Sequence, residues 1–129
     1  MPTRRSLLAL LGAAPFALAF PARAFEFRAY DKTAADKAIA SGKPVIIHVY
    51  ASWCLQCHIQ ASILDGLKAD KTYDGVAFFK VDYDGQKDVV AALGCPRSTV
   101  IGYKGGKEAA RMSWGVTQDS VIGVLKAVA

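Results

Sequence analysis

The chain has 129 residues, a length that suits one small domain, and 53% of them are hydrophobic, which supplies a core. Its formal net charge is +5, and the basic residues form no stripe of the kind that binds nucleic acid. These values argue against several domains and against a nucleic-acid partner.

Residues 1–24 have the pattern of an export signal. A basic start with Arg4 and Arg5 precedes an apolar run from Leu7 to Phe20, and an A-x-A cleavage site follows. The run is shorter than the roughly 20 residues that a membrane-spanning helix needs. A twin-arginine signal and a general secretory signal both fit. We expect a periplasmic or secreted domain over residues 25–129, with membrane contact only through an uncleaved signal.

The rest of the chain alternates between extended and helical patterns. Strands are predicted where β-branched or alternating apolar residues occur, and helices where apolar residues recur every three or four positions. The predicted strands are 25–30, Val45–Tyr50, Val76–Asp82, Thr99–Tyr103 and Glu108–Trp114. The predicted helices are Thr33–Ala40, Cys54–Lys68, Gln86–Leu93 and a last helix capped by Thr117.

The connections predict how these elements pair. The first central strands are joined by helices, so they are expected to be parallel with right-handed crossovers. The two glycines in Lys104-Gly105-Gly106-Lys107 predict a tight hairpin, so the last two strands are expected to be antiparallel. The result is an α/β domain with a mixed central sheet and helices on both faces. The expected inward faces of the second and last helices are Leu55, Ile59, Ile63 and Leu67, and Val121, Val124, Leu125 and Val128.

The stretch Trp53-Cys54-Leu55-Gln56-Cys57-His58 places two cysteines where a strand ends and a helix begins. A helix N-terminus presents unpaired N–H groups and a partial positive charge, and both stabilise a thiolate. Cys54 is therefore expected to be the exposed attacking sulfur, and Cys57, one turn deeper, to resolve the mixed disulfide. His58 lies four residues after Cys54 on the same helix face, and a protonated His58 would lower the pKa of Cys54 further.

At this point the chain resembles the thioredoxin family, and in particular its exported bacterial members. The residues that carry the resemblance are Gly42-Lys43-Pro44, Ala51 to Cys57, Val81 to Asp84, Thr99 to Lys107 and Gly115. The resemblance implies the thioredoxin-like three-layer fold and a thiol:disulfide oxidoreductase whose redox pair is Cys54 and Cys57. It assigns Trp53 to shielding the site and orienting partners.

The same resemblance implies how the protein works with others. The expected partners are protein thiols and disulfides, and a membrane-bound redox partner would supply electrons to a reducing enzyme. No cofactor beyond the cysteine pair and no resident metal are expected, and we expect a monomer.

Two positions depart from the family pattern. His48 stands six residues before Cys54, where thioredoxins carry a buried carboxylate, and it is either an acid–base group or a satisfied core residue. Ser98 precedes Thr99, where the family has a cis-proline. Because non-proline cis bonds cost about 3 kcal/mol, the Arg97–Ser98 bond is expected to be trans, and Ser98 would offer a hydroxyl beside the cysteines.

The number of cysteines is odd, and Cys95 is left over once Cys54 and Cys57 pair. Its position in the loop before Ser98 suits a third redox thiol, a metal ligand or a small buried residue. Trp114, Phe78 and Phe79 are interpreted as core residues, and Asp82 and Asp84 as solvated turn residues.

Three other functions remain open from the sequence. Cys54 and Cys57 with His58 or Cys95 would form a copper or other soft-metal site. The Cys-x-x-Cys-His pattern also attaches c-type haem, with His58 as proximal and Met112 as distal ligand, although the β-branched strands count against a helical cytochrome. A third alternative is a domain that only binds partners.

Overall fold

The computed structural model describes residues 27–129. In chain order this part of the protein contains β1 (Phe27–Ala29), α1 (Lys32–Ala40), β2 (Val45–Tyr50), α2 (Leu55–Gly66), a 3₁₀ turn (Lys71–Tyr73), β3 (Ala77–Asp82), α3 (Lys87–Leu93), β4 (Thr99–Lys104), β5 (Lys107–Ser113) and α4 (Gln118–Val128). The predicted elements are confirmed to within two residues at nearly every boundary, and the 3₁₀ turn was not predicted. The predicted export signal lies outside the described residues.

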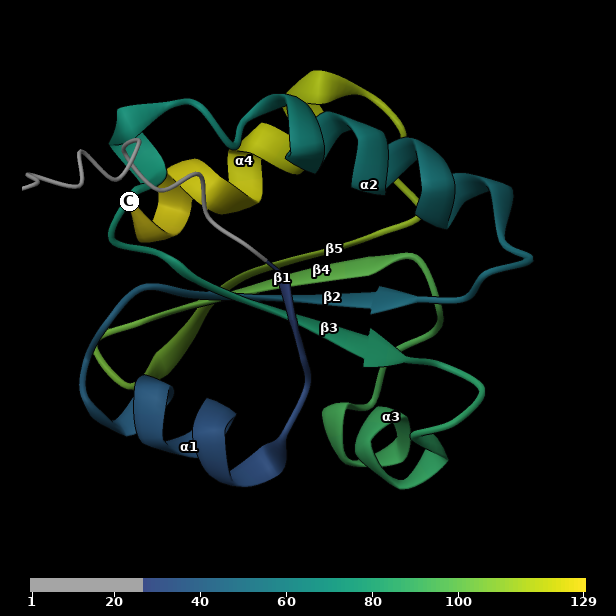
Figure 1. Ribbon diagram of the computed structural model, residues 1–129, viewed down its shortest axis with the longest axis horizontal. Coiled ribbons are helices and arrows are strands. Elements are labelled where there is room, and N and C mark those ends of the chain that lie inside the picture. The colour runs from purple at the N-terminus through teal and green to yellow at the C-terminus, as the bar shows by residue number, and fades with distance from the viewer. Residues whose placement is uncertain (1–26) are drawn as a thin grey trace, which may run out of the picture.

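The five strands form one mixed sheet in the order β1-β3-β2-β4-β5. β1, β3 and β2 are parallel, while β4 runs antiparallel to β2 and to β5. Figure 1 shows α2 and α4 on one side of this sheet and α1 and α3 on the other. The predicted three-layer α/β fold and the predicted strand directions are therefore confirmed.

The alternation of side chains along β2 divides the core into two. Ile46 faces α2 and α4 and packs with Phe78 and Leu125, whereas Ile47 on the opposite face packs with Phe79. The predicted inward face of α4 is confirmed, since all four of its apolar residues are buried. Gly102 of β4 lets α4 lie close to the sheet, because a Cβ there would come within 2.7 Å of a Val128 methyl carbon.

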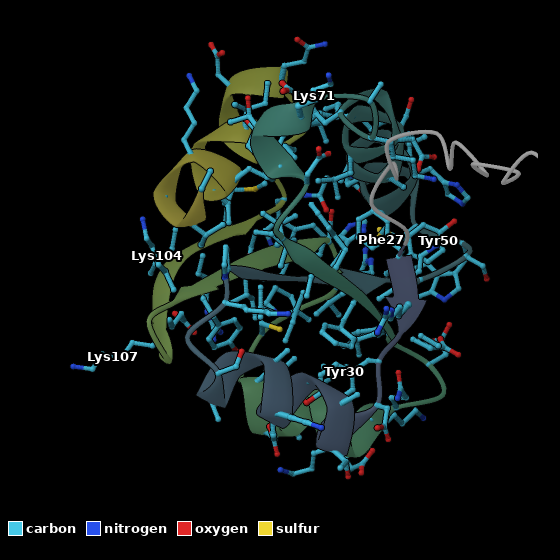
Figure 2. The ribbon with its side chains drawn as sticks, turned by 60° about the vertical axis from the view of Figure 1, so that its left-hand side comes forward. Phe27, Tyr30, Tyr50, Lys71, Lys104 and Lys107 are labelled. Carbon is cyan, nitrogen blue, oxygen red and sulfur yellow. The ribbon has the colours of Figure 1, made fainter. Side chains whose placement is uncertain are left out.

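Local signals place the helix and hairpin ends as the sequence predicts. Thr117 caps α4 by accepting a hydrogen bond from Ser120 N–H, and the Ser120 side chain bonds back to Thr117. Gly105 and Gly106 turn the β4–β5 hairpin with φ values of +61° and +82°, a conformation that favours glycine. Lys104 and Lys107 flank this turn and are exposed (Figure 2).

The predicted inward face of α2 is confirmed only in part, and the prediction for Trp114 is wrong. The buried residues of α2 are Cys57, Gln60 and Leu64. Ile63 and Leu67 of the predicted stripe pack against the core, whereas Leu55 is 70% exposed. Because Gln60 is polar, the apolar pattern did not show that it faces inward. Trp114 is not a core strand residue: it follows β5, has φ +65° and is 41% exposed.

No helix within residues 27–129 is long and apolar enough to cross a membrane.

Candidate active site

Strand β2 ends at Tyr50, and a short turn brings Cys54 to the N-terminus of α2. Cys54 is the N-cap residue, and its Sγ accepts a hydrogen bond from Cys57 N–H at 3.2 Å. Both cysteines are free thiols, and Cys57 Sγ lies 3.9 Å from Val49 O. The expected placement of the motif at a helix N-terminus is therefore found. The expected exposure of Cys54 is not, because Cys54 packs with Ala51 and Cys57 and is 1% exposed.

The two thiols have different acidities. Burial raises the pKa of Cys54, but hydrogen bonds from Cys57 and the Arg97 guanidinium outweigh it, so the pKa of Cys54 lies below that of an ordinary cysteine. Burial and the neighbouring Cys54 raise the pKa of Cys57. Because the thiolate is the nucleophile, this asymmetry favours Cys54 as the attacking sulfur and keeps Cys57 protonated at rest.

Trp53 is held over the site by contacts on three sides. Its indole Nε1–H donates to Asp84 Oδ2 at 2.7 Å, and its ring meets Tyr83 edge-on with centroids 6.4 Å apart. The Arg97 guanidinium carbon lies 4.6 Å from the Trp53 ring centroid and 4.8 Å from the Trp114 ring centroid. Asp84 is therefore more than a solvated turn residue, and Arg97 sits between two indoles beside Cys54.

Ser98 occupies the position that the family gives to cis-proline. No peptide bond among the described residues is cis, which confirms the trans prediction for Arg97–Ser98. Ser98 is fully buried with φ +60°, and its N–H donates to Val49 O. Its hydroxyl makes no hydrogen bond and lies near enough to Cys57 to oppose the rise in that thiol's pKa. The predicted placement of a hydroxyl beside the cysteines is thus found.

Thr99 anchors the loop that carries Arg97 and Ser98. It is buried at the start of β4, where its Oγ1 donates to Pro96 O at 2.9 Å and lies 2.8 Å from Ser113 Oγ. These contacts position the loop against β5, and none of them involves a cysteine.

His48 is buried in β2 and hydrogen-bonds Gln60, with 3.0 Å between His48 Nε2 and Gln60 Oε1. Gln60 Nε2 donates to Ser98 O and Gly115 O at 3.0 and 2.9 Å, which fixes the orientation of its amide. His48 therefore carries its proton on Nε2, and its buried Nδ1 is left without a partner. Burial lowers the pKa of His48 to about 4. The imidazole is neutral at rest, and its acid–base role stays a prediction.

His58 shares a helix face with Cys54 but does not turn its ring to it. Its Nδ1 lies 3.0 Å from the Tyr50 hydroxyl, and its Nε2 lies 2.6 Å from Ser52 O. The positive neighbour that lowers the pKa of Cys54 is Arg97 and not the predicted His58. A common helix face was not enough because the Ser52 carbonyl and the Tyr50 hydroxyl hold the ring.

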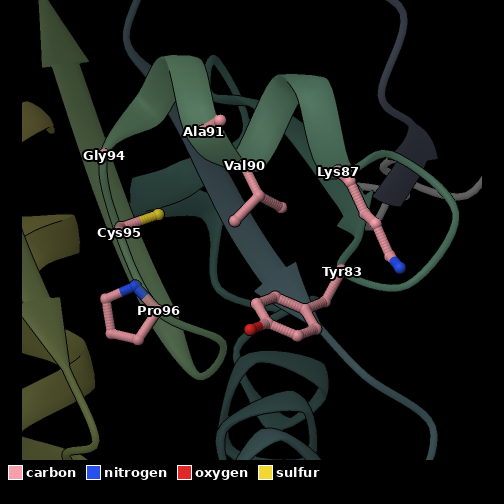
Figure 3. Close-up of a pocket in the computed structure, with 7 residues that line it drawn as sticks. All are labelled: Tyr83, Lys87, Val90, Ala91, Gly94, Cys95 and Pro96. Atoms are coloured by element: carbon pink, nitrogen blue, oxygen red, sulfur yellow. The ribbon is translucent and has the colours of Figure 1, made fainter.

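Cys95 lines a pocket of about 440 Å³ between α3 and the loop before β4. Figure 3 shows its sulfur directed toward Val90 and Tyr83. Burial raises the pKa of Cys95, which disfavours a reactive thiolate. Cys95 packs with the core beneath α3, whereas Cys54 and Cys57 form a separate cluster. This placement favours the interpretation of Cys95 as a packed residue.

The geometry gives no support to the metal or haem alternatives. No group of three or more His, Cys, Asp or Glu side chains within residues 27–129 is arranged to hold a metal ion. His58 is engaged by Ser52, and Met112 Sδ accepts from Gly115 N–H at 3.1 Å. His58 and Met112, the two predicted haem ligands, are thus engaged in hydrogen bonds with nearby residues.

Sequence reasoning missed Gln60, Arg97 and Asp84. The role of Gln60 was not predicted because a glutamine on a helix usually faces water. Its spacing from Cys57 and Leu64 was a signal, since it places the three residues on one face of the helix. Arg97 directly precedes Ser98. Because the resemblance places Ser98 at the site, it also places Arg97 near the cysteines.

Residues 26–127 match the family model described as Thioredoxin. The chain belongs to the thioredoxin family. It is 39% identical to Thioredoxin-2 of Saccharomyces cerevisiae over 79 residues, which cover 60% of this chain and 74% of the yeast protein. Thioredoxin-1 of the same yeast is 35% identical over 88 residues, covering 63% of this chain and 80% of that protein. The crystal structure of Trxlp from Edwardsiella tarda matches with a TM-score of 0.70 and 32% identity, over 74% of this chain and 94% of that one.

These relatives confirm the family and the fold that the sequence predicts. They also support the thiol–disulfide oxidoreductase activity of this thioredoxin, which acts on protein thiols and disulfides as its family does.

Proposed function

We propose that this thioredoxin reduces or exchanges disulfides of exported proteins in the cell envelope, with Cys54 as nucleophile and Cys57 as resolving thiol. The observation that carries the proposal is Cys54 at the N-terminus of α2, where its Sγ accepts the Cys57 N–H at 3.2 Å, and the lowered pKa of Cys54 and raised pKa of Cys57 agree with it. The Cys54 sulfur is available as an attacking thiolate, and the Cys57 sulfur stays protonated until the second step.

In the reducing direction, the Cys54 thiolate attacks one sulfur of the partner's disulfide. That S–S bond breaks, a Cys54–partner disulfide forms, and the departing partner thiolate takes up a proton. Cys57 then attacks Cys54 Sγ, the mixed disulfide breaks, and the Cys57 proton passes to the departing partner sulfur, which leaves as the second thiol. Two electrons pass to the partner, and the Cys54–Cys57 disulfide is reduced again by an electron donor, for which a membrane-bound redox protein is our proposal.

The surrounding residues divide the remaining work. Trp53 covers one side of the site through its bond to Asp84. The Cys57 N–H and the Arg97 guanidinium stabilise the Cys54 thiolate. The Ser98 hydroxyl, which has no other partner, faces Cys57 as that thiol deprotonates. His48 joins the site through the buried network of Gln60, where its lowered pKa suits a neutral hydrogen-bonding group.

Reduction of a disulfide-bonded protein, with dithiothreitol as electron donor, tests the two cysteine roles. The unmodified protein is expected to accelerate the reaction, and Cys54→Ser to return the rate to that of dithiothreitol alone. Cys57→Ser is expected to trap a partner on Cys54, visible as an added mass under non-reducing conditions. Cys95→Ser is the matched control and should retain activity. Equal losses in the Cys54 and Cys95 variants, or a trapped partner on Cys95, would contradict the assignment.

The proposed location rests on the signal-like residues 1–24. Intact mass measurement after cell fractionation is expected to find a protein beginning at Phe25 in the envelope fraction. Arg4→Lys with Arg5→Lys separates the two export routes, because only a twin-arginine signal depends on that pair. Uncleaved protein confined to the cytoplasm would contradict the proposal.

A further inference from the structure

Arg97 is a cation fixed in place next to the nucleophilic sulfur. Its guanidinium lies between the rings of Trp53 and Trp114, within 4.6 and 4.8 Å of their centroids. The three residues come from separate parts of the chain, the end of the β2 turn, the loop before β4 and the segment after β5. Contact with two indole rings restricts the side chain and leaves its N–H groups available as donors.

This cation has no carboxylate partner among the described residues. The ion pairs within residues 27–129 join Lys32 to Asp36, Lys68 to Asp65 and Arg111 to Glu108, and none involves Arg97. The anion that Arg97 stabilises is the Cys54 thiolate, and the residue as a whole is half-buried. A guanidinium has five N–H donors, so one that is held beside the thiolate and partly desolvated can also bind a carboxylate brought by another molecule.

The surface around Arg97 is apolar. The large apolar side chains that residues 27–129 leave exposed are Trp53, Leu55, Trp114 and Val116. Trp53 and Leu55 flank Cys54 in sequence, and Trp114 brings the segment after β5 against Arg97. An apolar surface around one cation fits an extended protein segment with apolar residues and one acidic side chain better than it fits a small, fully hydrated anion.

We infer that Arg97 determines specificity by binding a carboxylate that flanks the disulfide in a partner protein segment. The inference rests on the proposed function, because it assumes that Cys54 attacks that disulfide. The hydrogen bond from Trp114 N–H to Ser98 O, 2.8 Å long, keeps the second indole in place over the guanidinium. The partner's carboxylate gives Arg97 the carboxylate contact that residues 27–129 do not provide.

The test uses three disulfide-bonded peptides that are identical except for the residue beside one cysteine, which is glutamate, glutamine or lysine. Single-turnover reduction by the full-length reduced protein is measured by rapid acid quench and thiol alkylation. The glutamate peptide is expected to react roughly fivefold faster than the glutamine peptide, and the lysine peptide more slowly still. Because the attacking thiolate is common to all three peptides, the ratio of rates isolates recognition from nucleophilicity.

Arg97→Gln is expected to bring the glutamate-to-glutamine ratio close to one, and Arg97→Lys to retain part of the preference. Lys107→Gln removes the same charge from the exposed hairpin turn (Figure 2) and should leave the ratio unchanged. Turnover of all three peptides without a charge preference, or a preference that survives in Arg97→Gln, would overturn the inference and leave the proposed function standing.

Two further outcomes separate the inference from its premises. Arg97-dependent reduction of oxidised glutathione as fast as the glutamate peptide would overturn the assignment to a protein segment. No turnover of any peptide by the unmodified protein would overturn the proposed function and this inference with it.

Discussion

Replacing Gln60 with leucine is expected to lower the free energy of unfolding by about 2 kcal/mol or more, because it leaves His48 Nε2 and Gly115 O without this partner and removes one of the two donors to Ser98 O. Gln60 accepts from His48 Nε2 and donates to the carbonyl oxygens of Ser98 and Gly115, at 3.0, 3.0 and 2.9 Å. Leucine has a similar volume, so the loss reports the hydrogen bonds and not a cavity. Urea unfolding of the reduced protein measures it.

The same substitution is expected to disturb the active site. Gln60 ties the carbonyl of Ser98 to helix α2, and Ser98 holds its left-handed φ of +60° directly after Arg97. Gln118→Leu is the matched control, since Gln118 is exposed at the start of α4. A loss for Gln60→Leu of less than about 1 kcal/mol, no greater than that of Gln118→Leu, would show that the network does not hold the fold together.

The fold was predictable because its signals are local and repeated. The β-branched run Val45–Tyr50 identifies the central strand, and Gly105-Gly106 identifies the hairpin. Helices between the early strands imply parallel pairing, and the hairpin implies an antiparallel edge. Each of these features depends on residues close together in the chain, and the structure confirms them.

The sequence predicted only those parts of the site that are built from residues close together in the chain. The two cysteines at a helix N-terminus follow from a few neighbouring residues, whereas the cation beside Cys54 depends on three distant segments meeting at Arg97. The burial of Cys54 could not be predicted for the same reason. The pairing of His48 with Gln60 depends on a β2 side chain and an α2 side chain together, and the sequence did not indicate that the polar Gln60 faces inward.

His48 is expected to make the protein less stable as the pH falls, and His48→Gln to remove that effect. Burial lowers the pKa of His48 from 6.5 to about 4, with a smaller contribution from the nearby Lys80. The hydrogen bond to Gln60 opposes this shift. Between pH 6.5 and about pH 4, His48 is therefore protonated in the unfolded chain and neutral in the folded protein. Stability from this group is fully present above pH 6.5 and declines toward pH 4.

The expected size follows from the shift. Between about pH 7.5 and about pH 4.5, the wild-type protein should lose about 2.5 kcal/mol relative to His48→Gln, whose amide can keep a bond to Gln60 without titrating. Other carboxylates titrate in the same range, so the difference between the two proteins is the quantity to measure, by urea unfolding at each pH. His58→Gln is the control and should follow the wild-type protein, because His58 lies at the surface beside Ser52. A constant difference between wild type and His48→Gln would mean that the buried imidazole accepts its proton at little cost, which the burial of its unpaired Nδ1 argues against.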